Sequence, residues 1–100
     1  MRFSWDERKN ASNLAKHGVS FKRATLVFDD PHAVSIPDDH EAETRWLTIG
    51  LVNGVLLLVV IHTVREQHHE EEIRIISARK ATRRERETYE QNLAGSSSKE

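Results

Sequence analysis

The dipeptide Asn53-Gly54 divides the most apolar part of the chain into two halves. Asn-Gly is favoured in two-residue hairpin turns, because both central positions of a type I′ turn need positive φ angles. The flanking segments, residues 44–52 and 55–64, are rich in valine, isoleucine and leucine, which favour strands. The sequence therefore predicts a β-hairpin at the centre of the fold.

A two-residue turn also fixes which residues oppose one another across the hairpin. Val52 would face Val55, and each step back along one strand would match a step forward along the other. This register places Arg45 opposite His62, where the hydrophobic face ends. Residues 55–61 are apolar at every position, which is typical of a central strand buried on both faces.

Capping signals predict the helices. Asp6 begins a helix that ends at Gly18, and Ser20 begins a second one that runs to Phe28. Thr82 and Glu85 have the spacing of a reciprocal capping box, which predicts a last helix to about Leu93 with Tyr89 and Leu93 as its apolar anchors. Further strands are predicted at residues 2–5, 32–36 and 72–79.

This order of elements predicts an α+β domain. We expect an antiparallel sheet of four or so strands, with two N-terminal helices packed on one face and a C-terminal helix. A chain of 100 residues holds one core, so residues 1–94 should form a single domain and residues 95–100 a flexible tail.

Composition excludes several classes of protein. The chain has no cysteine, so neither a disulfide nor a catalytic thiolate is available. Its longest apolar run, residues 55–61, is far shorter than the roughly 20 residues that cross a bilayer. We therefore expect a cytoplasmic protein with no membrane partner.

The net charge is only −1, but the charges are segregated. Residues 2–23 hold six basic side chains, and residues 29–43 hold six acids and no lysine or arginine. Residues 74–86 then hold five arginines and a lysine against a single acid, Glu85. If the fold brings the two basic segments together, a face that attracts anions results.

Three segments of the chain resemble the signature blocks of the BrnT toxin family. They are "FSWDERKNASNLAKHGVSF", "ETRWLTIG" and "IRIISARKATRRERETYE", which occur in the expected order over nearly the whole chain. The resemblance implies a small RelE-like fold and a metal-independent ribonuclease that suppresses translation. It also implies a cognate DNA-binding, BrnA-like antitoxin, whose complex with the toxin binds operator DNA and represses the operon. Where many relatives have Thr-Glu-Arg, this chain has Thr63-Val64-Arg65.

Cleavage of RNA without a metal requires a base, an acid and cations that stabilise negative charge on the phosphate. His62 is our leading acid–base candidate, because it ends a buried strand and is predicted to face a cation. The alternative is a histidine that bonds its neighbours at the edge of the core. Lys16 and His17 lie at the end of the first predicted helix, where the helix dipole favours cations. This structural explanation accounts for the charge of both residues. Only the resemblance makes them candidates for substrate contact or proton transfer.

Arginine can hold two phosphate oxygens at once, so the strand arginines are candidates for phosphate contact. We include Arg65 and Arg79 among the candidate catalytic residues. Arg79 is the strongest candidate for phosphate contact, because it ends its strand beside the basic run. The alternative is an ordinary solvated face with acidic partners. The remaining candidates for substrate binding are Trp5, Arg45, Arg74, Lys80, Arg83 and Arg84. For Trp5 a core position is the alternative, and for Arg83 and Arg84 a solvated helix.

The pair His68-His69 beside Glu70 to Glu72 could suggest a metal site. Adjacent strand residues point to opposite faces, so they do not easily share one ion. We interpret this segment as a polar turn and expect neither a metal nor a cofactor. A different functional class also fits: the same basic surface could hold RNA or a partner protein without cleavage, as a co-repressor.

Overall fold

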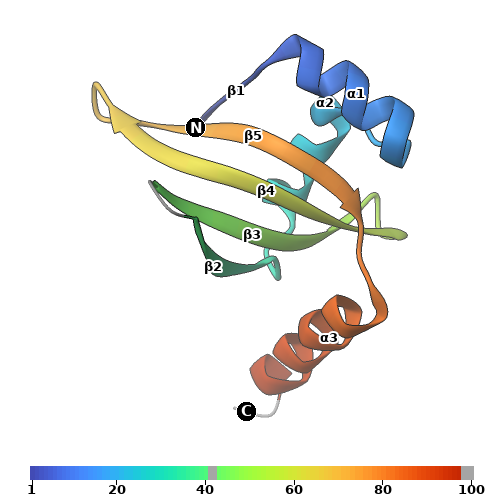
Figure 1. Cartoon of the computed structure of the whole chain (residues 1–100). Helices are drawn as coiled ribbons and strands as arrows, with labels where there is room; N and C mark the ends of the chain where they lie inside the picture. The colour runs from blue at the N-terminus through green and yellow to red at the C-terminus, as the bar shows by residue number, and fades with distance from the viewer. Residues whose placement is uncertain (41–42, 98–100) are drawn as a thin grey trace.

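The computed structural model describes residues 1–40 and 43–97 (Figure 1). The elements in chain order are β1 (Arg2–Trp5), α1 (Glu7–His17), α2 (Phe21–Ala24), the 3₁₀ helix η1 (Thr25–Asp29), β2 (Val34–His40), β3 (Glu43–Val52), β4 (Leu56–Gln67), β5 (Glu70–Lys80) and α3 (Arg83–Ser97). The α+β class is therefore confirmed. Residues 98–100 of the predicted tail lie outside the described part, and α3 continues through Ser97, beyond the end predicted near Leu93.

The sheet has five strands in the order β1-β5-β4-β3-β2. Neighbours run antiparallel except β1 and β5, which pair in parallel from Arg2 opposite Glu72 to Trp5 opposite Ile75. The sheet is thus mixed, and the expectation of a purely antiparallel sheet was wrong. Local sequence patterns predict that residues 2–5 form a strand, but they carry no information about which strand pairs with it.

The two faces of the sheet are covered by different helices (Figure 1). On one face, Phe21, Ala24 and Val27 of α2 and η1 pack on Leu58 and Val60 of β4. A Cβ at Gly50 would lie 2.6 Å from Val27 Cγ1, so a glycine there lets η1 lie close against β3. On the other face, Tyr89 and Leu93 of α3 pack over Ile49, Leu57 and Val59. α2 and η1 therefore lie on one face and α3 on the opposite one. α1 lies beside β5, where its buried Asn13 bonds the Ala78 backbone, so the helix arrangement differs in detail from the prediction. The predicted second helix is a short α2 followed by η1.

The predicted helix caps are confirmed. Asp6 Oδ1 accepts hydrogen bonds from the backbone N–H groups of Arg8 and Lys9, and Gly18 ends α1 with φ of 72°. Thr82 and Glu85 form the reciprocal pair at α3: Thr82 N donates to Glu85 Oε1 at 2.8 Å, and Glu85 N donates to Thr82 Oγ1 at 3.2 Å.

The central hairpin forms as predicted, but its register differs by one residue. Asn53 and Gly54 have φ of 55° and 71°, and Val55 N donates to Val52 O at 3.2 Å. Val55 is nevertheless an extra residue, and the ladder begins with Val52 opposite Leu56. A shift of one residue changes every pair along the strands.

His62 consequently lies opposite Trp46, and Arg45 lies opposite Asp38 of β2. The predicted pairing of Arg45 with His62 was therefore wrong. The Asn-Gly signal identifies the turn, but the extra residue beside it leaves no mark in the sequence.

A second irregularity lies in β5. Ile61 pairs with Ser77 and His62 with Ile75, so Ile76 is an extra residue on β5. Such a β-bulge bends its strand and redirects side chains. At the other end of β5, His68 and His69 form the turn from β4. Their φ angles are 57° and 64°, and a two-residue hairpin turn needs such positive values. The interpretation of this segment as a polar turn is therefore confirmed. In the described ranges, no group of side chains suited to a metal ion occurs and no helix is long and apolar enough to cross a membrane.

Candidate functional site: the groove between α1 and β5

A buried asparagine joins α1 to β5. Asn13 is only 8% exposed, and its Nδ2 donates to Ala78 O at 2.7 Å and to Val19 O at 2.9 Å. Its Oδ1 accepts from Ala78 N at 3.1 Å. The Asn13 amide thus makes the pair of bonds to Ala78 that a neighbouring strand would make. It takes this place because β1 ends opposite Ile75.

Between α1 and this part of β5 lies a groove of about 210 Å³. It is lined by Lys9, Ser12, Asn13, Lys16, His17, Ile76 and Ser77. None of these residues carries a carboxylate, and three of them can be cationic. Lys16 and His17 occupy the last turn of α1, where the helix dipole stabilises positive charge. The groove is therefore suited to an anion such as a phosphate.

The groove also offers proton-transfer chemistry. His17 is half-buried, and an imidazole is the side chain most often used as a general acid or base. The exposed Lys16 ammonium can stabilise negative charge. Hence the structure brings together two of the predicted catalytic residues.

His62 lies elsewhere. It is 3% exposed, it packs edge-on against Phe28 with ring centroids 4.9 Å apart, and its Nε2 shares a hydrogen bond of 2.7 Å with Thr48 Oγ1. Burial lowers the pKa of His62 to about 4, although the Thr63 backbone acts in the opposite direction. Nδ1 has no hydrogen bond of ordinary geometry within the described part of the chain. A side chain that is buried in this position cannot reach RNA. This agrees with the alternative interpretation of His62 as a core histidine that bonds its neighbours.

The strand arginines lie on the face that α3 covers in part. Arg74 pairs with Thr63, and Arg65 pairs with Glu72. Strand alternation places Arg45, Arg65 and Arg74 on the same side as Leu47 and Ile61. None of these three arginines is among the residues that line the groove with Lys16 and His17.

Arg79 is held by α3. Its Nη1 and Nη2 donate to the two carboxylate oxygens of Glu85 at 2.7 and 2.8 Å. The hydrogen bonds from Arg79 lower the pKa of Glu85 to about 2, and those to Glu85 raise the pKa of Arg79. A phosphate at Arg79 would have to displace this carboxylate. The guanidinium that we considered the strongest candidate for phosphate contact thus has an internal partner.

The other predicted contacts lie at the periphery. Trp5 is half-buried, it packs edge-on against Phe21, and its indole N–H donates to Glu7 at 2.9 Å, which fits the core alternative. Lys80 and Arg84 are exposed. Arg83, with 92% of its side chain exposed, makes a loose ion pair of 3.7 Å with Glu87.

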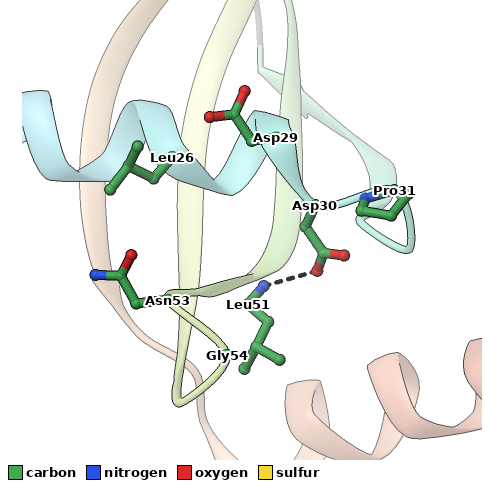
Figure 2. A pocket seen from close by; sticks show the side chains of 7 residues that line it. All are labelled: Leu26, Asp29, Asp30, Pro31, Leu51, Asn53 and Gly54. Atoms are coloured by element: carbon green, nitrogen blue, oxygen red, sulfur yellow. Dashed lines mark hydrogen bonds between the residues drawn. The ribbon is translucent and has the colours of Figure 1, made fainter.

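A second hollow, of about 310 Å³, lies between η1 and the hairpin turn (Figure 2). Asp29 and Asp30 line it, so it does not suit a phosphate. Figure 2 shows Asp30 directed toward the Leu51 backbone, and Asp30 Oδ2 accepts from Leu51 N at 2.8 Å and from Tyr89 Oη at 2.6 Å. Burial acts to raise the pKa of Asp30, but the hydrogen bonds that it accepts outweigh burial and lower it. Asp30 is therefore a structural link between η1, β3 and α3.

Asn13 and Ser77 are groove residues that the sequence did not indicate. Asparagine is unfavourable inside a helix, so Asn13 in the middle of α1 is a weak signal of a buried polar contact. Ser77 gives no signal, because its position depends on the bulge at Ile76.

The chain is similar to known proteins in sequence and in fold. A family model described as "Ribonuclease toxin, BrnT, of type II toxin-antitoxin system" matches residues 5–85. The crystal structure of the Brucella abortus ribonuclease toxin BrnT is 29% identical in sequence and superposes with a TM-score of 0.62. The match covers 83% of this chain and 99% of that one. No curated protein sequence matches the chain significantly.

Proposed function

This chain belongs to the BrnT family of ribonuclease toxins of type II toxin–antitoxin systems, and we propose that it cleaves RNA without a metal ion in the groove between α1 and β5. The observation that carries this proposal is the lining of the groove: Lys9, Lys16 and His17 with no carboxylate among them. Magnesium prefers carboxylate oxygens, and ammonium groups repel it. The same cations suit a phosphodiester.

In the proposed reaction, the imidazole of His17 takes the proton of a ribose 2′-hydroxyl. The 2′-oxygen attacks the adjacent phosphorus, the bond to the 5′-oxygen breaks, and a 2′,3′-cyclic phosphate forms. The Lys16 ammonium stabilises the extra negative charge on the phosphate oxygens during this step. The leaving 5′-oxygen takes up a proton from a protonated groove side chain or from water.

The remaining basic side chains would attract the RNA backbone independently of sequence. Lys80, Arg83 and Arg84 follow one another from the end of β5 into α3, whereas Arg45, Arg65 and Arg74 lie outside the lining of the groove and act at longer range. Cleavage of RNA would inhibit translation. Because translation takes place in the cytoplasm, we propose that the chain acts there. A type II toxin has a protein antitoxin, and we propose that it is a BrnA-like DNA-binding protein through which the complex contacts operator DNA.

The test is incubation of the purified chain with labelled RNA in EDTA. The wild-type chain should cleave, whereas His17→Ala and Lys16→Ala should lower the rate by about 10²-fold or more, as expected for acid–base and charge-stabilising groups. His32→Ala and Lys22→Ala are matched controls, because both side chains are exposed and lie outside the groove. RNA that binds but stays intact at high protein excess would refute the enzyme and leave a non-catalytic co-repressor.

A further inference from the structure

Resting on the proposed function, we infer that Ser77 is a further substrate-contacting residue of the groove, and that its hydroxyl donates a hydrogen bond to a phosphate oxygen of bound RNA. Ser77 is half-buried, and it lies on β5 across the groove from Lys9 and Lys16 of α1.

The bulge in β5 is what brings Ser77 to this position. Successive residues of a regular strand point to opposite faces, so only one of two neighbours can line a given groove. Ile76 and Ser77 are neighbours, and both line this one. The reason is that Ile76 is unpaired, since Ile61 opposes Ser77 and His62 opposes Ile75. Bulges of this kind often occur beside active sites, where they redirect a side chain.

Asn13 fixes the backbone on which Ser77 sits. The Asn13 amide bonds both the N–H and the C=O of Ala78, the residue that follows Ser77. The Ser77 hydroxyl itself donates to Asn13 Oδ1 over a long distance of 3.5 Å. A bond of this length is weak, so the hydroxyl can rotate toward a ligand at little cost.

The charges around Ser77 favour a phosphate as that ligand. A phosphate bound by Lys16 in a groove of about 210 Å³ lies within reach of the opposite wall, where Ser77 is the residue of β5 with a side-chain donor. A hydroxyl that donates to an anion in a partly desolvated site makes a stronger bond than one between neutral groups.

The experiment compares Ser77→Thr with Ser77→Val. Both side chains are β-branched, suit a strand and have nearly the same shape, but only threonine keeps the hydroxyl. We expect kcat/KM for RNA in EDTA to stay within about 3-fold of wild type in Ser77→Thr and to fall about 10-fold or more in Ser77→Val, as for a lost hydrogen bond to a charged group. Equal activities of the two variants, with equal melting temperatures, would overturn the assignment.

Thr44→Val is the control, because Thr44 is an exposed strand residue of β3 that lies outside the groove. It should retain activity within a few-fold, and a loss as large as that of Ser77→Val would contradict a specific role for Ser77. If the wild-type chain does not cleave RNA at all, the proposed function fails, and affinity for a short RNA decides this inference instead. Weaker binding by Ser77→Val than by Ser77→Thr would support the phosphate contact, and equal binding would refute it.

Discussion

The two faces of the sheet are built in different ways. Under α2 and η1, the core is continuous, with Phe21, Leu58 and Val60 fully buried. Under α3, the apolar contact is thin: Ile61 is only partly buried, and Ile36 of the edge strand is 40% exposed.

Polar contacts follow the same division. Asn13 and His62 are buried within the first face, whereas α3 is held by hydrogen bonds from Arg79 to Glu85 and from Tyr89 to Asp30. A hydrogen bond between buried groups is costly to break, because the remaining partner is left without water. The first face is therefore a rigid support for the groove, and α3 is a more loosely attached element.

The strongest test of this comparison is Asn13→Ala. It leaves the N–H and C=O of Ala78 and the C=O of Val19 without their partner, and unsatisfied buried groups cost about 1–3 kcal/mol each. We expect the free energy of unfolding to fall by about 3 kcal/mol, measured by urea denaturation. Asn92→Ala on α3, where the amide makes one exposed bond of 3.4 Å, should cost about 0.5 kcal/mol or less. Equal losses would show that the two faces are equally well anchored.

A second test uses the burial of His62. The pKa of His62 is about 4 in the folded protein, whereas its ordinary value, which applies to the unfolded chain, is 6.5. Between these two pH values, the unfolded chain therefore binds more protons than the folded protein. Stability should therefore fall as the pH decreases from about 6.5 toward 4, by at most about 3 kcal/mol.

The check is urea denaturation at pH 7, 6 and 5. His62→Gln should be less stable at pH 7, because its core is altered, but it should lose most of this pH dependence. His32→Gln is the control, since His32 is exposed. A pH dependence unchanged in His62→Gln would mean that His62 is accessible and can be protonated in the folded protein.

Much of the fold could be predicted from local chemistry. The Asn53-Gly54 turn, the cap at Asp6 and the capping box of Thr82 and Glu85 each follow from residues within a few positions of one another. The parallel pairing of β1 with β5 joins segments about 70 residues apart, and no local pattern indicates it. The register error at the hairpin and the unpredicted bulge in β5 have the same origin, because one extra residue at Val55 or Ile76 leaves the apolar pattern almost unchanged.

The candidate site was predictable only in part. Lys16 and His17 were identified through resemblance, and the structure places them together in a groove. His62 and Arg79 were identified from their position at strand ends, which does not show what the side chain meets. His62 meets Phe28 and Thr48, and Arg79 meets a carboxylate from a helix that follows it in sequence. Such tertiary contacts decide whether a polar residue faces solvent or the protein.

The smallest expected effect concerns Glu85→Gln, which tests how α3 is attached. The folded pKa of Glu85, about 2, lies below its ordinary value of 4.5, so the ionised carboxylate stabilises the fold above about pH 4.5 and loses this contribution as the pH falls toward 2. The bonded groups are partly exposed, with 31% of the Arg79 side chain accessible, so solvent screening limits the effect to about 1 kcal/mol. Unfolding measured at pH 7 and pH 3 should show the variant less stable than wild type at pH 7 and closer to it at pH 3.

Glu90→Gln on the exposed side of α3 is the control. RNA cleavage should stay within a few-fold of wild type, because the groove is supported by the other face. If cleavage instead rises markedly when Arg79 loses its carboxylate partner, then Arg79 binds substrate and the two faces do not act separately.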